Sequence, residues 1–242
     1  KSRYKEEVIV FSKQKAIDIT DSGDCFDKRN VIVYARNYSF EVAKQLGIQY
    51  FLQLDDDYSA FNYTLDSDLQ YITKQFQIKN LNQLFNKTLK FFKNTKAITT
   101  VAFAQGGDYM GGENSTLAKL GSKGLFARKV MNTFFCDVSR PFKFFGTLNE
   151  DVNMYVSQGL KGKVFITIPM VRIVQKETQT NKGGLTDIYL NLGTYVKSFY
   201  SVMYAPACVK ISEFGVINKR LHHKVIWKKT APCIISDSVC SN

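Results

Sequence analysis

The sequence predicts a three-layer α/β fold with a mostly parallel central sheet. Short β-branched or aromatic runs of the buried-strand type alternate with segments whose apolar residues recur at helical spacing. Near the N-terminus the order is strand, helix, strand, which favours parallel pairing through a crossover connection. The 242 residues are 45% hydrophobic and 22% charged, so we expect a single domain, 1–242, with a substantial core.

The first predicted strands are two β-branched runs, EVIVF at 7–11 and NVIVYAR at 30–36. The stretch between them, 18–29, is polar and rich in turn-forming residues, so it is expected to be a loop. Both runs are short and bounded by polar residues, and this pattern is typical of strands that are buried on both faces.

A short helix over 40–46 is predicted next, with Ser39 as its cap and Gly47 as its terminator. The strand 50–54 follows directly. Because a helix joins two strands here, we expect residues 31–34 to pair with 50–54 in parallel. The end of strand 50–54 then lies at the carboxyl edge of the sheet, where open α/β folds bind ligands.

The same criteria predict the later elements. In chain order they are a hairpin over 60–78, an amphipathic helix starting at Asn80, a buried strand at 97–103, a glycine-rich loop at 105–115, strand character over 124–137, a helix from about Asn149 to Gly159, a buried strand at 163–169, a long helix capped by Thr186 and reaching Met203, and a basic tail from Ala205.

Three consecutive carboxylates follow the strand 50–54, in the stretch YFLQLDDDYSAF. Adjacent like charges repel, and the cost remains unless a cation or a set of donors compensates it. In an extended segment Asp55 and Asp57 point one way and Asp56 points the other. Two carboxylates at a strand end suit Mg²⁺ or Mn²⁺, so we expect a metal there; the alternative is a solvated acidic turn.

The formal net charge of +12 favours a polyanionic partner, with nucleic acid first and an acidic membrane surface second. A merely soluble basic protein is the alternative. Between 205 and 230 six cations face one acid, Glu213, which suits a groove that follows a phosphate backbone. The residues expected to contact nucleic acid are Arg128, Lys210, Lys219, Arg220, Lys228 and Lys229.

No apolar run approaches the ~18 residues of a membrane span, so no membrane association is expected. The five cysteines are scattered and form no CxxC pair, which argues against a zinc knuckle or a disulfide framework. A reducing compartment, the cytoplasm, is the expected location.

A buried strand that ends in Asp-x-Asp after a strand–helix unit resembles the GT-A class of nucleotide-sugar glycosyltransferases. The resemblance implies a GT-A-like, Rossmann-type fold in which Asp55 and Asp57 hold Mn²⁺ or Mg²⁺ with the donor diphosphate. It also implies that LNED supplies the acidic pair at a helix start, with Asp151 as general base and Glu150 as its substitute. His222 or His223, the two histidines of the chain, would be the third metal ligand.

A narrower resemblance is carried by YARNYSFEVAKQLGIQYFLQLDDDYSAF, GSKGLFARK, NEDVNMYV and GGLTDIY. Together these stretches are similar to the TET-associated glycosyltransferases, a group that includes phage enzymes thought to glycosylate hydroxymethylated pyrimidines in DNA. The resemblance implies a UDP-sugar donor, with UDP-glucose first, and an acceptor hydroxyl on a modified base or on a sugar already attached to it. A phage enzyme would work in the host cytoplasm.

Other cations and one acid are expected around the donor. Arg36 ends a predicted strand near the aspartates and could reach the nucleotide, or form a surface salt bridge. Lys123 and Lys224 could touch the diphosphate as point charges. Asp56 is expected to help seat the ribose or the sugar. We expect residues up to about 104 to bind the donor and 105–242 to bind the acceptor.

Three other functions fit parts of the pattern. A glycosyltransferase acting on protein or polysaccharide would use the positive charge for membrane attachment. A metal-dependent nucleotidyltransferase also gathers aspartates around metal ions and presents a basic face. A DNA-binding module without activity would need no acidic site at all.

Overall fold

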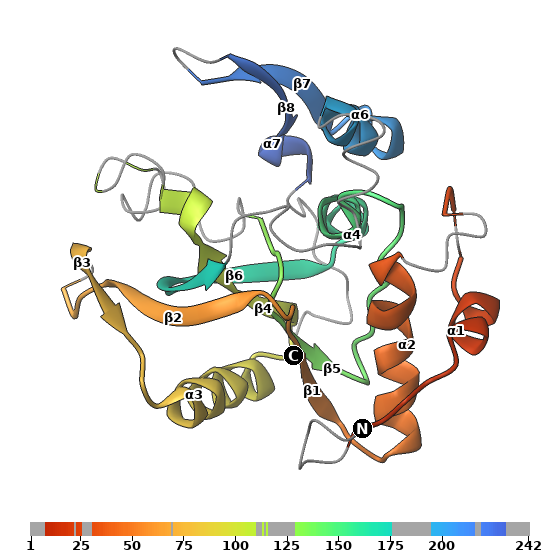
Figure 1. The fold of residues 1–242 in the computed structure, drawn as a ribbon, viewed down its shortest axis with the longest axis horizontal. Helices are drawn as coiled ribbons and strands as arrows, with labels where there is room; N and C mark the ends of the chain where they lie inside the picture. The colour runs from red at the N-terminus through yellow and green to blue at the C-terminus, as the bar shows by residue number, and fades with distance from the viewer. Residues whose placement is uncertain are drawn as a thin grey trace.

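The computed structural model describes residues 8–21, 23–25, 31–68, 70–109, 113, 115, 129–175, 195–215 and 219–230. Their centre is a six-stranded sheet with the order β1-β5-β4-β6-β2-β3 (Figure 1). A separate two-stranded sheet pairs β7 with β8. The strands are β1 (Tyr50–Gln53), β2 (Tyr58–Leu65), β3 (Tyr71–Gln77), β4 (Ile98–Gln105), β5 (Phe134–Asp137), β6 (Val164–Gln175), β7 (Val209–Phe214) and β8 (Arg220–Val225).

Helices lie on both faces of the large sheet (Figure 1). On one face β5 contributes Phe135 to a core that also receives Phe92 from α3. On the other face β5 contributes Phe134 and Cys136 to a core shared with α2 and α4. This alternation confirms the predicted three layers. The described helices are α1 (Lys13–Ile19), α2 (Ile32–Gln45), α3 (Leu81–Asn94), the 3₁₀ turn η1 (Gly106–Tyr109), α4 (Glu150–Gly159), α6 (Tyr195–Tyr204) and α7 (Trp227–Thr230).

The central sheet is mixed, which corrects the expectation of a mostly parallel sheet. Among the described strands β4 and β6 pair in parallel, whereas β1–β5, β4–β5, β2–β6 and β2–β3 are antiparallel. The reason is that β5 inserts between β1 and β4 in the opposite direction, and that β2 and β3 form a hairpin at the far edge. Strand β1 is therefore an edge strand of the sheet, with α2 beside it.

The two predicted N-terminal strands are wrong. Residues 8–11 form no strand, and 32–45 form the helix α2, so the parallel pairing of 31–34 with 50–54 does not exist. Strand β1 pairs with β5 instead. The buried side chains of α2, among them Val33, Phe40 and Ala43, recur at helical spacing across the whole stretch, and their burial overrides the β propensity of its first residues. The short helix α1 was missed.

Several other predicted elements are confirmed. The hairpin over 60–78 is β2–β3, and the strand at 97–103 is β4. Asn80 caps α3, because its side chain accepts a hydrogen bond from the Gln83 amide at 3.0 Å. Gly47 ends α2 with a φ of +67°. The predicted long helix is described only as α6, since 176–194 lie outside the described residues.

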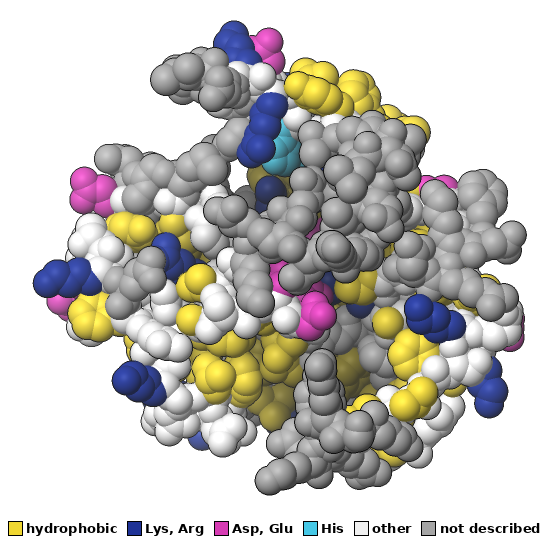
Figure 2. All heavy atoms as spheres, viewed as in Figure 1, with side chains coloured by type: hydrophobic (Ala, Val, Ile, Leu, Met, Phe, Trp, Pro, Cys, Tyr) yellow, Lys and Arg dark blue, Asp and Glu magenta, His cyan; other side chains and the backbone are white. Residues whose placement is uncertain are grey.

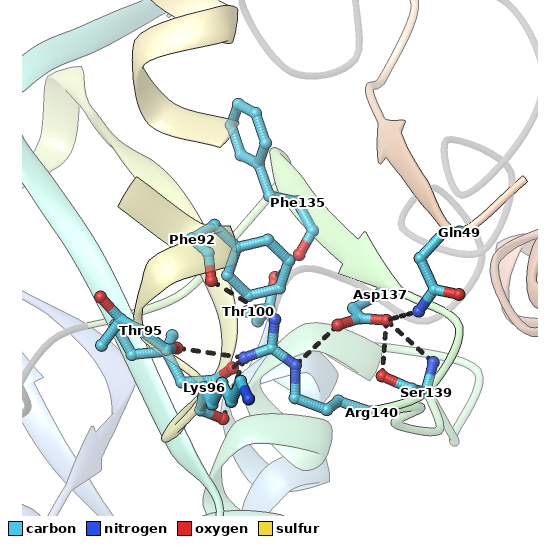
Figure 3. A network of polar contacts seen from close by, with 10 residues as sticks. Gln49, Phe92, Thr95, Lys96, Thr100, Phe135, Asp137, Ser139 and Arg140 are labelled. Atoms are coloured by element: carbon cyan, nitrogen blue, oxygen red, sulfur yellow. Dashed lines mark hydrogen bonds and ion pairs between the residues drawn. The ribbon is translucent and has the colours of Figure 1, made fainter. Parts of the chain in front are cut away.

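Arg140 joins three structural elements in a partly buried polar network (Figure 3). Its Nη1 donates to the carbonyls of Thr95, Lys96 and Ile98 at 3.1, 3.0 and 2.5 Å, just after α3 ends. Its Nε donates to Asp137 at 2.9 Å. Hydrogen bonds from Ser139 and Arg140 lower the pKa of Asp137 although its burial opposes this. The network fixes the C-terminal end of α3 against β5.

The basic tail folds onto the rest of the chain. Hairpin β7–β8 lies with α6 and α7 at one end of the molecule, away from the large sheet (Figure 1). Helix α7 packs closely on α4: a Cβ at Gly159 would lie 2.5 Å from the Thr230 carbonyl oxygen. In the part of the chain that the structure describes, no helix is long and apolar enough to cross a membrane.

Candidate active site

Residues 36–39 of α2 form hydrogen bonds with two segments that are far apart in the sequence. The Gln53 amide at the end of β1 donates to the Arg36 carbonyl at 2.9 Å and to Ser39 Oγ at 2.8 Å. Asn37 bonds the Phe144 backbone twice, with its Nδ2 donating at 2.9 Å and its Oδ1 accepting at 2.8 Å. The strand that precedes the aspartates and the segment that precedes α4 are therefore both fixed to one turn of α2.

The guanidinium of Arg36 brings the two predicted acidic motifs together. Its Nη2 lies 2.9 Å from Asp55 Oδ1 and 3.5 Å from Glu150 Oε1. Arg36 is 7% exposed, and Glu150 and Asp151 are buried as well. Asp55, from the DDD segment, and Glu150, from LNED, thus share one buried cation although 95 residues separate them in the numbering.

Two aromatic rings hold the guanidinium in place. Its central carbon lies 5.1 Å from the ring centres of both Phe134 and Phe144. Cation–π contacts of this kind are worth more when they are shielded from water. Phe134 comes from β5 and Phe144 from the segment fixed by Asn37, so the position of the charge is set by the core.

Burial in this cluster makes the carboxylates hard to ionise. Desolvation, opposed by Arg36, raises the pKa of Asp55 to about 6. Desolvation and the charge of Asp151 raise the pKa of Glu150 to about 7. Nearby Glu150 and Asp55 raise the pKa of Arg36 although burial opposes this, so Arg36 stays charged. Three carboxylates against one guanidinium leave the cluster short of positive charge.

Helix α4 begins with the acidic pair, as predicted. Asn149 precedes it in the left-handed conformation, with a φ of +52°. The Asn149 side chain donates to the Lys197 carbonyl at 2.7 Å and to Ser201 Oγ at 3.1 Å, which ties the start of α4 to α6. The carboxylate of Asp151 accepts a hydrogen bond from the Val152 amide at 2.7 Å. The ion pair with Arg36 is made by Glu150 and not by Asp151.

Asp56 and Asp57 lie in a tight turn between β1 and β2. The chain is not extended there, so the predicted alternation of an extended segment does not apply. Asp55 and Asp57 are half-buried and Asp56 is exposed. Asp57 Oδ1 accepts a long, 3.5 Å hydrogen bond from Gln175 at the end of β6. Figure 2 shows acidic side chains near the centre of this face of the molecule.

The chemistry of these side chains fits a divalent cation. Carboxylate oxygens are the ligands that Mg²⁺ and Mn²⁺ prefer, and the excess of negative charge needs a further cation. Within the described residues, no three His, Cys, Asp or Glu side chains gather into a set that could hold a metal ion. A dication bound by Asp55 and Asp57 would therefore need further oxygens, such as those of a diphosphate.

The two histidines lie on β8, next to α6 and away from β1 (Figure 1). His223 is buried, and burial together with His222 lowers its pKa to about 3, so its ring is neutral. In the part of the chain that the structure describes, neither ring nitrogen of His223 has a hydrogen-bond partner. The rings of His222 and His223 are 4.5 Å apart. The structure does not group either histidine with the aspartates, and their role as metal ligands stays a prediction.

The predicted nucleic-acid contacts lie mainly on the β7–β8 unit, which comprises residues 195–215 and 219–230 with α6 and α7. Lys210, Lys219, Arg220, Lys228 and Lys229 are exposed, and so is Lys224. Lys219 pairs with Glu213 at 2.9 Å, and both side chains are more than 60% exposed. Two further predicted residues, Lys123 and Arg128, lie outside the described residues. Figure 2 shows histidine with Lys or Arg side chains above the acidic centre, toward this hairpin.

A cavity of about 610 Å³ lies elsewhere, between α1, α2 and residues 141–143. None of the clustered acids lines it. The Arg36 cluster, where charged groups converge, is therefore a stronger candidate for the functional site than this cavity.

Comparison with known proteins decides the family. A family model described as TET-Associated Glycosyltransferase matches residues 3–184, which is more than half of the chain. The chain belongs to this family. It is therefore a glycosyltransferase, an enzyme that needs a sugar donor and an acceptor. No curated protein and no solved structure matches.

The family match of this TET-associated glycosyltransferase includes the DDD segment, the acidic pair of α4 and the Arg36 turn, but it ends before α6. The two histidines and the basic β7–β8 unit thus lie beyond it.

Sequence reasoning missed the aromatic clamp formed by Phe134 and Phe144, and the bracing role of Asn37. The sequence gives no periodic signal for either, since they lie on different elements and meet only through the fold. Arg36 was predicted to end a strand, whereas it lies in α2 and points into the core.

Proposed function

We propose that this TET-associated glycosyltransferase is a metal-dependent, GT-A-like enzyme that acts on DNA. It transfers a sugar, with UDP-glucose as the first donor to test, to a hydroxyl on a hydroxymethylpyrimidine or on a sugar already attached to the base. The observation that carries the proposal is the convergence of Asp55 and Glu150 on Arg36. This contact supports the proposal because it puts Asp55, the proposed metal ligand, and Glu150, the neighbour of the proposed base Asp151, on one guanidinium.

On the donor side, Asp55 and Asp57 hold Mn²⁺ or Mg²⁺, and the exposed Asp56 contacts the ribose or the sugar. When bound, the dication neutralises charge on the leaving diphosphate. Lys224 and Lys123 supply point charges to the same diphosphate. Residues up to about 104 form most of this donor half.

On the acceptor side, Asp151 takes the proton of the acceptor hydroxyl. The acceptor oxygen bonds to the sugar carbon as the bond from that carbon to the diphosphate breaks, so a single displacement inverts the configuration. Glu150 is paired with Arg36, and that contact makes it the weaker candidate for the base. It remains the alternative base, since its raised pKa of about 7 suits proton transfer near neutral pH.

The DNA acceptor is supported by charge. The unit formed by 195–215 and 219–230 carries seven cations and one acid, and most of these cations are exposed. Asn149 ties this unit to the start of α4, so an acceptor that binds the unit lies next to the acidic pair. A base inside a duplex has to leave the stack before its hydroxyl can reach Asp151. Glycosyl transfer to protein or polysaccharide is the alternative.

Mass spectrometry of digested nucleosides tests the proposal. The protein is incubated with Mn²⁺, a panel of sugar nucleotides, and DNA with or without hydroxymethylated bases. The proposal expects a mass gain of one sugar on the modified nucleoside, with release of the nucleoside diphosphate and loss of turnover in EDTA. Pyrophosphate release would instead indicate nucleotidyl transfer, and UDP release that is independent of DNA and insensitive to salt would refute the DNA acceptor.

A further inference from the structure

Arg36 is a buried cation in contact with Asp55, the proposed metal ligand. Its guanidinium is buried, and its Nη2 is within ion-pair distance of two carboxylates from different motifs. Nε and Nη1 are buried and have no hydrogen-bond partner among the described residues. The charge therefore acts on the acids mainly through one nitrogen.

Packing prevents this cation from leaving. The rings of Phe134 and Phe144 lie at 5.1 Å on the guanidinium, and Asn37 fixes the Phe144 backbone to the same turn of α2. An exposed lysine or arginine could swing into solvent when a metal arrives. Arg36 cannot, so any cation that binds Asp55 must bind in the presence of this fixed charge.

The two ion pairs differ in a way that matters for metal binding. The contact with Asp55 is 2.9 Å and the contact with Glu150 is 3.5 Å, both from Nη2. If Asp55 turns its oxygen toward a dication, Glu150 stays close enough to keep the guanidinium neutralised. Without Glu150 the guanidinium would depend on Asp55 alone.

We infer that Arg36 is a resident counter-cation: it assembles Asp55 and Glu150 in the metal-free protein and competes with the incoming dication for Asp55. This makes Arg36 a positioning residue and not a nucleotide contact. The inference rests on the proposed function in one respect, since it takes Asp55 as a metal ligand. The role of Glu150 follows from it: Glu150 receives Arg36 when Asp55 binds the metal.

Isothermal titration with Mn²⁺ in the presence of saturating UDP, whose diphosphate supplies the further oxygens, tests the competition, with R36M and R36K as the variants. Methionine keeps an unbranched apolar chain against the two rings but removes the charge. We expect R36M to bind Mn²⁺ about tenfold more tightly than the unmodified protein, because one competing cation is gone. R36K keeps the charge and should bind Mn²⁺ about as the unmodified protein does. Equal or weaker binding by R36M would overturn the inference and leave the proposed metal dependence intact.

A second pair of variants decides the matter if R36M does not fold. E150Q and D151N each remove one buried carboxylate, but only Glu150 contacts Arg36. In E150Q, Asp55 is the remaining carboxylate that pairs with Arg36. Mn²⁺ must then compete with a stronger ion pair for Asp55, so E150Q should weaken Mn²⁺ binding more than D151N does. Equal weakening would contradict the inference.

Failure of the proposed metal dependence gives a different result. If the unmodified protein binds no Mn²⁺ in the presence of UDP, the metal part of the proposed function fails, and thermal unfolding in EDTA then tests the assembly role of Arg36. R36M/E150Q should unfold at a higher temperature than R36M, because glutamine removes a carboxylate that has lost its partner. A double variant no more stable than R36M would refute that role.

Discussion

Replacing Arg140 by methionine should destabilise the protein by about 3 kcal/mol. The side chain spans α3 and β5, and its guanidinium donates to the carbonyls of Thr95, Lys96 and Ile98 and to the carboxylate of Asp137 (Figure 3). It also lies 4.3 Å over the Phe92 ring. Methionine can keep the packing against this ring but makes none of the hydrogen bonds.

The size of this loss depends on which partners of the Arg140 guanidinium keep other hydrogen bonds in R140M. Hydrogen bonds to charged groups are worth about 1.5–3 kcal/mol each, but the Arg140 side chain is 20% exposed, so water can replace some of them. Asp137 keeps its bonds from Ser139 and Gln49, so its charge is not left alone. One fully lost charged pair and partly hydrated carbonyls at the end of α3 together give about 3 kcal/mol.

Urea unfolding followed by circular dichroism measures this loss. The matched control is K44M, which breaks the exposed pair of Lys44 with Glu41 and should change the unfolding free energy by less than about 0.5 kcal/mol. An R140M midpoint equal to that of K44M would refute the reasoning. It would mean that water replaces the Arg140 hydrogen bonds without loss of unfolding free energy.

Three further predictions concern α4. The pKa of Glu150 is raised to about 7, so between about pH 4.5 and 7 the folded state keeps a proton that the unfolded chain has lost. The unfolding free energy should therefore fall as the pH rises through this range. Urea titrations at several pH values should show a flatter slope for E150Q. G159A should cost about 1–3 kcal/mol in thermal or urea unfolding, because its Cβ would meet the Thr230 carbonyl, and unchanged stability would contradict the close packing of α7 on α4. N149A should lose the bonds to α6, lower stability by about 2 kcal/mol and slow sugar transfer, whereas an effect on stability with normal turnover would argue against its placing the acidic pair.

Much of the fold could be predicted where local signals agree with the final environment. The hairpin β2–β3 has a turn at LDSD, α3 has Asn80 as its cap, and β4 is buried over nearly its full length. The failure at 30–36 has a physical cause. Ile32 and Val33 favour strands, but the helical spacing of the buried face of α2 continues through Phe40, and tertiary packing decided the outcome.

The candidate site shows the same division. The acids were found because like charges at the end of an apolar strand need a partner, and because a carboxylate pair starts a helix. Their partner Arg36 was expected to contact the nucleotide, and its ion pairs with Asp55 and Glu150 were not predicted. Nothing local in the sequence shows that Arg36 points inward against Phe134 and Phe144, because these three residues meet only after β5 inserts beside β1. The sheet order, which single-sequence patterns do not specify, placed them together.

The most direct test is the single-turnover rate of sugar transfer in D151N and D68N, measured with the donor and modified DNA found by mass spectrometry. Asp68 is an exposed residue on the β2–β3 turn and serves as the control. The account predicts a loss of about 100-fold or more in D151N, the contribution of a general base, and an unchanged rate in D68N. A D151N rate within twofold of the unmodified enzyme would contradict the placement of the acceptor base at the start of α4.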